Sequence, residues 1–368
     1  MIKSKGEICF IVRKLKLKKK LVVLLVVVLI LPSMLFVTAC GRNSKKFVAV
    51  FLYSLTDSYI LELKNNMEEL FDGTKMNVKF YDAERNQTTQ NSQITTAISK
   101  GADLLVVNIV DRNDEPANIV VSKAKNANIP IIFFNREVTD SVIKSYEQAY
   151  HVGFDSAYFA ENLQGEVIFE SLKNDWNATT KKFKTIELYE GKIPFVQFRG
   201  EIGSLDLGLL MQSVVKANSL LQAAEMPTLI QIGLTVHEYF RAEVKYKMET
   251  LLNNYPLDGS AGPKIQIVVA QNDDIALGVI DALENYGHYT GSNSKIRIFG
   301  IEGTSEARES IRAGRLTGTV YSNIETLAEL VVKMTENILD GKDVLLDLNY
   351  TFVSYVNKIY LDYDYILG

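Results

Sequence analysis

The apolar residues of this chain form short runs of strand length that alternate with longer stretches of helical periodicity. The clearest unit is the segment 264–283, where the apolar run 265–270 is followed by Gln271-Asn272-Asp273 and then by apolar residues at helical spacing. Asn272 is a favourable helix N-cap. The unit predicts a strand that ends directly in a helix, with polar side chains at the junction.

The same alternation of strand and helix patterns continues along most of the chain. Alternating β and α elements favour parallel sheets with right-handed crossovers. Two such series of about 110–170 residues each predict an α/β fold with two doubly wound parallel-sheet lobes. We expect strands at 47–53, 76–81, 104–109, 130–135, 195–198, 228–232, 265–270, 296–301, 318–321, 350–353 and 359–361, and helices at 57–71, 87–99, 117–127, 156–172, 205–221, 240–252, 273–286, 305–313 and 324–339.

The strand-to-helix junctions are the candidate binding positions. In open α/β sheets, ligands bind beyond the carboxyl ends of the strands, and a cleft between two lobes is a favoured small-molecule site. Asp57, Asp206 and Asn272 lie at such junctions. For each of them, helix capping or a solvated turn is the alternative interpretation.

The N-terminus has the pattern of an export signal. Residues 1–20 carry eight Lys or Arg residues and one acid, and the apolar run 21–37 is followed by Thr38-Ala39-Cys40. The segment 37–40 resembles a bacterial lipobox, in which Cys40 is acylated and becomes the mature N-terminus. An uncleaved membrane anchor is the alternative, since the apolar run nearly reaches spanning length. Both interpretations export the rest of the chain.

Composition then narrows the function. Residues 1–39 carry eight of the 40 basic and one of the 44 acidic residues, so their removal changes the net charge from −4 to −11. No nucleic-acid partner is expected of so acidic a chain. The only cysteines are Cys9 and Cys40, and the histidines are scattered, so neither a thiol nucleophile nor a metal cluster is expected. No catalytic arrangement of residues is found, and an enzyme is the least favoured class.

Six segments at these junctions carry a resemblance to a known family. They are 50–59, 131–137, 149–156, 200–206, 270–273 and 299–302, and they run in order along nearly the whole mature chain. Together they resemble the periplasmic galactose/glucose-binding proteins. The resemblance implies a two-lobed type I binding protein with a three-segment hinge, which delivers a hexose to the permease of an ABC importer.

The resemblance also implies a set of ligand contacts. Aromatic rings can sandwich the C–H faces of a sugar, and carboxylates and amides match its hydroxyls. Tyr59 and Tyr239 would form the sandwich, although the family usually has Trp at the second position. The polar contacts that match the family by type are Tyr53, Asp57, Asn135, Asp206 and Asn272.

Other positions depart from the family. Ser204 stands where the family has His, Leu210 where it has Arg, Glu302 where it has Asp, and Ser322 where it has Asn. Loss of the Arg removes a charge and up to five donors from the site. The ligand can therefore differ from galactose or glucose. Nearby donors that could compensate are Arg199, Gln212 and Arg241.

The calcium loop of the family is also replaced. A calcium site needs closely spaced oxygen ligands. The equivalent segment 186–194 contains Leu188, Lys192 and Pro194, and Gln266 stands in place of the distant bidentate Glu. We expect no calcium and no other cofactor.

These inferences give a domain plan and two functional hypotheses. Hinge segments are expected near 153–155, 321–323 and 353–356. The first hypothesis is a lipid-anchored monosaccharide-binding component of an ABC importer, held at the outer face of the cytoplasmic membrane, or in the periplasm if an outer membrane is present. The second is a sensing receptor that a chemoreceptor or sensor kinase reads. The plan assigns 1–39 to the signal, 40–46 to the tether, 47–153 plus 323–353 to the N-terminal lobe, and 154–322 plus 354–368 to the C-terminal lobe.

Overall fold

The first strand shows why the first sheet forms. In β1 (Phe47–Leu52) every side chain is buried, as expected of a strand that is covered on both faces. The computed structural model describes residues 45–368 apart from 156, 201–211, 237–240, 257 and 287–295. Within it, the compact unit Lys46–Gly368 contains every described helix and strand. No described helix is both long and apolar enough to span a membrane.

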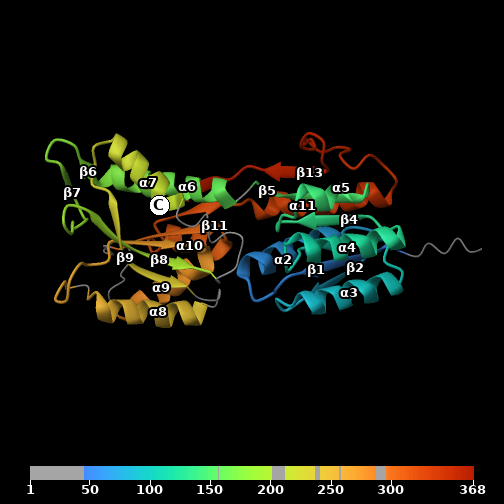
Figure 1. Cartoon of the computed structure of the whole chain (residues 1–368), viewed down its shortest axis with the longest axis horizontal. Helices are drawn as coiled ribbons and strands as arrows, with labels where there is room; N and C mark the ends of the chain where they lie inside the picture. Colours follow the sequence, from blue (N-terminus) through green and yellow to red (C-terminus); the bar gives the residue numbers. More distant parts are fainter. Residues whose placement is uncertain (1–44, 156, 201–211, 237–240, 257, 287–295) are drawn as a thin grey trace, which may run out of the picture. The chain divides into compact units, whose positions relative to one another are not determined.

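The first lobe is built on a six-stranded parallel sheet in the order β13-β5-β4-β3-β1-β2. Helices α2 and α11 pack on one face of this sheet, and α3, α4 and α5 pack on the other (Figure 1). The bounds are β1 Phe47–Leu52, α2 Ser58–Asp72, β2 Asn77–Asp82, α3 Gln87–Ser99, β3 Leu104–Val107, α4 Asp114–Ala127, β4 Ile131–Phe134, α5 Asp140–Lys144, β5 Ala149–Phe154, α11 Ile324–Leu339 and β13 Lys358–Leu361.

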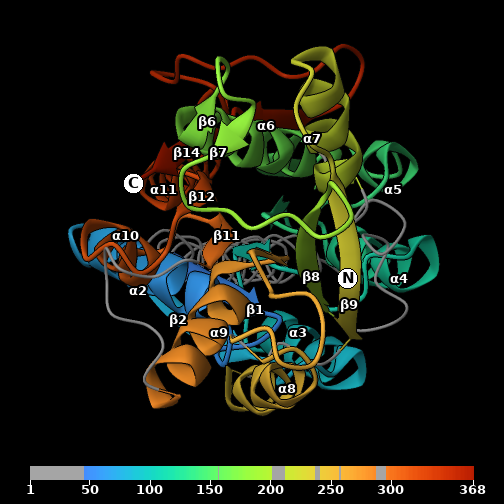
Figure 2. The ribbon, with the colours of Figure 1, turned by 90° about the vertical axis from the view of Figure 1, so that its left-hand side faces the viewer.

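The second lobe repeats the plan with the order β14-β12-β11-β10-β8-β9, in which only β14 is antiparallel. Helices α6 and α7 cover one face, and α8, α9 and α10 cover the other (Figure 2). The bounds are α6 Ala157–Asp175, β8 Ile193–Arg199, α7 Gln212–Ala223, β9 Leu229–Val236, α8 Arg241–Asn254, β10 Ile267–Ala270, α9 Asp273–Asn285, β11 Arg297–Glu302, α10 Ser305–Arg312, β12 Gly318–Tyr321 and β14 Asp364–Leu367, with a small antiparallel pair β6 Trp176–Asn177 and β7 Lys182–Phe183.

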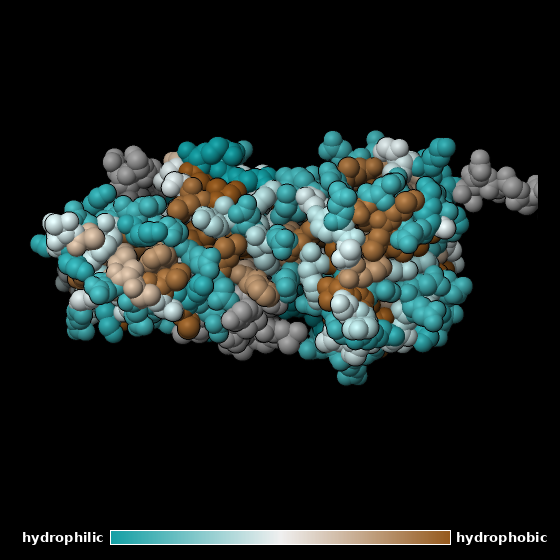
Figure 3. Space-filling view, turned by 90° about the horizontal axis from the view of Figure 1, so that it is seen from above, coloured by the Kyte–Doolittle hydropathy of each residue, from teal (hydrophilic) through white to brown (hydrophobic). Residues whose placement is uncertain are grey.

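The apolar cores lie between each sheet and its helices. Four clusters of buried side chains, one on each face of each sheet, account for this arrangement. Figure 3 shows that hydrophobic side chains reach the viewed face only as separate patches among hydrophilic ones. The predicted class, two doubly wound parallel-sheet lobes, is confirmed.

The chain crosses between the lobes three times, and one crossing differs from the expected place. The first follows Phe154 and the second falls at Ser322-Asn323, close to the expected hinge segments. The third was expected near 353–356, but β13 pairs in parallel with β5 of the first sheet, and the crossing falls at Asp362-Tyr363. The assignment of 354–361 to the C-terminal lobe was therefore wrong.

The physical reason is burial of the C-terminal strand in the first lobe. Ile359 and Leu361 pack into the core beneath α2 and α11. The strand expected at 350–353 does not form, because this segment belongs to a turn in which Val353 N–H donates to the Lys358 carbonyl. Strand β14, which the pattern of the sequence missed, then completes the second sheet.

Candidate functional site

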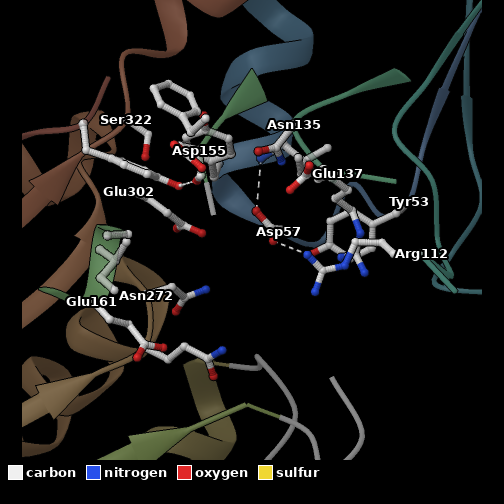
Figure 4. Close-up of a pocket in the computed structure, with 18 residues that line it drawn as sticks. Tyr53, Asp57, Arg112, Asn135, Glu137, Asp155, Glu161, Asn272, Glu302 and Ser322 are labelled. Atoms are coloured by element: carbon white, nitrogen blue, oxygen red, sulfur yellow. Dashed lines mark hydrogen bonds between the residues drawn. The ribbon is translucent and has the colours of Figure 1, made fainter. Parts of the chain in front are cut away.

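The candidate site is a cavity of about 230 Å³ where the carboxyl ends of strands from both lobes meet. Its volume lies slightly below the usual range for ligand pockets, roughly 300–1,000 Å³, and so favours a small ligand. Of the ten predicted ligand contacts, seven line it (Figure 4): Tyr53, Asp57, Tyr59, Asn135, Asn272, Glu302 and Ser322.

Asp57 both caps a helix and faces the cavity. Its Oδ1 accepts from Ile60 N–H at 3.1 Å, which starts α2, and its Oδ2 accepts from the Tyr53 hydroxyl. Burial and the neighbouring Asp57 hold the pKa of Tyr53 well above its ordinary value, so this phenol stays a donor. Each carboxylate oxygen can accept a second bond, so the capping role leaves Asp57 able to accept from a ligand.

Asn272 plays the equivalent part in the second lobe. Its Oδ1 accepts from Ile275 N–H at 3.0 Å and caps α9. Because the oxygen is used in capping, the amide nitrogen is the group left for a ligand, and Figure 4 shows it directed towards the cavity. For Asp57 and Asn272, the capping interpretation and the lining interpretation both hold.

Contacts between the lobes lie next to these two caps. The N–H of Ser58, at the start of α2, donates to Oδ2 of Asp274 at 3.2 Å. One turn further along α2, Glu62 accepts from the N–H and hydroxyl of Ser305, at the start of α10. The N-termini of α2, α9 and α10 therefore meet at one border of the cavity.

Two predicted residues bring buried polar atoms that have no hydrogen-bond partner within the described part of the chain. They are the hydroxyl of Tyr59, whose side chain is 3% exposed, and Oε2 of Glu302. Burial, followed by repulsion from Asp57, Asp273 and Asp274, raises the pKa of Glu302 well above its ordinary value. Buried polar atoms are rarely left unsatisfied in proteins, so both atoms are candidates for a hydrogen bond to a ligand or water.

The backbone places the next two predicted residues. Asn135 follows β4 with a φ of 59°, a left-handed conformation that Asn tolerates better than most residues. Ser322 lies at the second crossing, and its N–H donates to the Glu302 carbonyl at 3.0 Å. Both side chains line the cavity.

Several lining residues were missed by the sequence interpretation. Arg112 and Arg136 bring positive charge from the first lobe, and the Arg136 guanidinium lies 4.3 Å from the centre of the Tyr53 ring. Arg241, a proposed substitute for the missing Arg, instead forms ion pairs with Asp281 and Glu306. The signal for Arg136 was its place directly after Asn135.

Aromatic residues at the crossings were also missed. Phe154 and Tyr363 line the cavity with stacked rings whose centres are 5.0 Å apart. The Tyr363 hydroxyl donates to the Asp155 carbonyl at 3.1 Å. Tyr363 was missed because the third crossing was expected earlier in the chain, near 353–356, and no strand-to-helix junction marks its position.

Glu137 is a lining residue held from behind by the C-terminal strand. Its Oε1 accepts from Lys358 Nζ at 2.8 Å and from the Tyr360 hydroxyl, both on β13. Burial raises the pKa of Glu137, but the hydrogen bonds from Lys358 and Tyr360 outweigh burial and hold it below the ordinary value. The side chain of Lys358 is 1% exposed and also pairs with Asp140 at 2.8 Å.

Asp273 lies behind the cavity and titrates in an unusual range. It is fully buried, and its carboxylate accepts from Thr319 Oγ1 at 2.6 Å and from Thr304 N–H at 2.8 Å. Burial raises the pKa of Asp273 to about 7, against the opposing effect of these hydrogen bonds. Gly300 makes room for it, because an added Cβ there would lie 2.3 Å from its Oδ1.

A pH dependence of stability follows from Asp273. Its folded pKa lies above the unfolded value of about 3.9, so its contribution is fully present below pH 4 and is lost as the pH rises towards 7. Asp273→Asn should flatten this slope and stabilise the protein at pH 8 by a few kcal/mol relative to its effect at pH 4. Urea unfolding at pH 4.5, 6 and 8 measures this pH dependence. If the free energy of unfolding changes with pH by the same amount in both proteins, the role given to Asp273 is contradicted.

Three predicted contacts and the lipid site lie outside the described residues. These are Ser204, Asp206, Tyr239 and Cys40, and the position of the missing Arg, Leu210, lies there too. Their roles remain predictions.

The segment in place of the calcium loop has its own contacts. Glu187 N–H donates to Oε1 of Gln266 at 3.1 Å, and Lys264 Nζ pairs with the Glu187 carboxylate at 2.8 Å. No group of three or more His, Cys, Asp or Glu that could hold a metal ion occurs among the described residues.

Comparisons with known proteins agree with this geometry. A family described as the periplasmic binding protein domain matches residues 48–343. The chain is 29% identical to the D-galactose/methyl-galactoside binding periplasmic protein MglB of Haemophilus influenzae, over 85% of this chain and 89% of the relative. It is 23% identical to the ribose import binding protein RbsB of Escherichia coli, over 83% and 89%.

Solved structures show the same fold. An ABC transporter solute binding protein from Bacillus halodurans with bound myo-inositol aligns with a TM-score of 0.65 and 24% identity. The alignment covers 89% of this chain and 96% of that one. The predicted resemblance is confirmed.

Proposed function

The chain belongs to the periplasmic binding protein family, and from this premise we propose that it captures a monosaccharide outside the cytoplasm and delivers it to an ABC importer. Members of this family bind substrates and are not enzymes. The named relatives bind galactose or ribose, and the solved neighbour holds myo-inositol. A hexose like galactose or glucose is the proposed ligand.

The observation that carries the proposal is the composition of the cavity. Planar amides and carboxylates from both lobes, among them Asp57, Asn135 and Asn272, meet around a space of about 230 Å³. Such groups pair with hydroxyls that both donate and accept, and Phe154 and Tyr363 add an apolar wall. Both the size and the polarity suit one small polyol.

We further propose a lipid anchor and calcium-free binding. Acylation of Cys40 would hold the protein at the outer face of the membrane. Incorporation of a labelled fatty acid, lost in Cys40→Ser, tests the anchor, and incorporation that survives the substitution would contradict it.

Calcium-free binding rests on the replacement of the metal-loop residues around Glu187, and a chelator arm in the binding experiment tests it.

Thermal unfolding with a panel of ligands tests the proposed function. Galactose, glucose, ribose, xylose and inositol would each be added, with and without EDTA. A ligand at 100 times its Kd stabilises by about 2.7 kcal/mol, which raises Tm by several degrees. One pyranose should raise Tm, and EDTA should leave the shift unchanged. If none of these ligands raises Tm, the proposal that a neutral hexose is the ligand is contradicted.

Sensing is the alternative use of the same ligand-bound lobes. Uptake of the labelled sugar separates the two uses, because a transport component is needed for accumulation of its ligand. Loss of uptake on deletion of the gene supports import. Normal uptake with loss of a chemotactic or kinase response supports sensing.

A further inference from the structure

One end of the cavity brings several carboxyl groups close together. Glu302 ends β11 with its Oε2 buried and without a partner within the described residues. The charged groups that act on it include Asp57, the N-cap of α2, and Asp273 and Asp274 on α9. The charged groups that face Glu302 from these elements are therefore carboxyl groups, which disfavour a negative charge on Glu302, while a hydrogen bond from the Asp273 backbone favours it.

The positive charges of the cavity lie at its other end. Among the described lining residues, the second lobe supplies Glu161 and Glu302 but no Lys or Arg. Arg112 and Arg136 come from the first lobe, and Figure 4 shows Arg112 beside Tyr53, on the opposite side of the cavity from Glu302. Of the carboxylates on this side of the cavity, Asp57 accepts from the Tyr53 hydroxyl and Glu137 is bonded to Lys358. The part of the lining that the structure describes is thus polarised.

A neutral sugar brings no positive charge to pair with Glu302. A buried carboxylate is stable only when it is paired, hydrogen-bonded or protonated. A hydroxyl supplies one donor and no charge, whereas an ammonium supplies three donors and a full positive charge. The Tyr59 hydroxyl, also buried and without a partner, lines the same cavity and can accept from such a group.

We propose, resting on the function proposed above, that the preferred ligand is an amine-bearing sugar or polyol whose ammonium group is bound by Glu302. The hydroxyls of the ligand pair with Asp57, Asn135 and Asn272. Glu302 is then the residue that sets the choice between an amino sugar and the hexose of the same shape.

Calorimetric titration of the full chain in detergent tests this inference. The probes are D-galactosamine and D-glucosamine, each against its parent hexose and its neutral N-acetyl derivative, at pH 6 and low salt. At least one amino sugar should bind tenfold or more tightly than its parent. Glu302→Gln, which keeps the shape but not the charge, should bring that ratio close to one. Glu309→Gln, at an exposed position on α10, is the matched control and should keep the preference.

A second readout follows the proton. Burial raises the pKa of Glu302, so the empty protein holds a proton there that the incoming ammonium displaces. The carboxyl O–H breaks, the proton passes to buffer, and the carboxylate pairs with the ammonium. Binding heats should then differ between buffers of high and low ionisation enthalpy in the wild type, and should agree in Glu302→Gln.

Each outcome decides the matter. Hexose binding equal to or tighter than amino-sugar binding overturns the inference and leaves the proposed function intact. Amino-sugar preference that persists in Glu302→Gln also overturns it, because a residue other than Glu302 would then bind the ammonium group. Binding of no sugar of either class overturns the proposed function as well. A ligand-free melting curve for each variant shows that it is folded.

Discussion

Replacing Lys358 by methionine should lower the free energy of unfolding by about 3 kcal/mol. Removal of one partner of a buried ion pair costs roughly 3–5 kcal/mol, and the lower end applies because Glu137 and Asp140 are partly exposed. Loss of the cation also frees Glu137, a cavity residue, so ligand affinity should fall in parallel. Urea unfolding and titration measure the two effects.

A matched control separates burial from loss of charge alone. Lys333→Met removes an ammonium on α11 that is partly exposed and forms a loose ion pair with Asp347, at 3.9 Å. Surface pairs of this kind contribute about 0–1 kcal/mol. Equal destabilisation by the two substitutions would contradict the structural role given to Lys358.

Asp57→Ala should weaken ligand binding by about 100-fold. The substitution removes a carboxylate that faces the cavity, and a hydrogen bond to a charged group contributes about 1.5–3 kcal/mol, or roughly 10- to 100-fold. It also removes the N-cap of α2 and the acceptor of the Tyr53 hydroxyl, so stability should fall by about 1–2 kcal/mol. Titration and thermal unfolding measure both.

Asp57→Asn distinguishes the two roles of this residue. Its amide oxygen can still accept from Ile60 N–H, so α2 should keep its cap and most of the stability should return. The negative charge is lost, so affinity should stay well below the wild type. Full affinity in the alanine variant would show that Asp57 is a capping residue only.

The sequence predicts the elements whose side-chain pattern is strong. Helix α3 and the pair β12 and α11 have the expected bounds, and the junction at Asn272 has the expected strand, cap and helix. Seven predicted contacts meet in one cavity because parallel strands bring their carboxyl ends to the same edge. Local pattern and topology together were sufficient to predict these elements and contacts.

Features that depend on long-range packing were not predicted. A strand was expected at 359–361, but its place in the first sheet was not, because Lys358, Ile359 and Leu361 have their partners far back in the chain. Arg112 follows a buried strand but has no periodic signal. Its place at the cavity follows from where β3 sits in the sheet, which periodicity does not specify.

The most direct test of the account is calorimetric titration of the wild type and of the double variant Asp57→Ala/Asn272→Ala with the monosaccharide that gives the largest melting shift. The account predicts saturable binding at one site per chain in the wild type, and loss of most of the affinity in a double variant that remains folded. Absence of binding to any sugar or amino sugar, or equal affinity in the two proteins, would contradict the claim that this cavity captures the ligand.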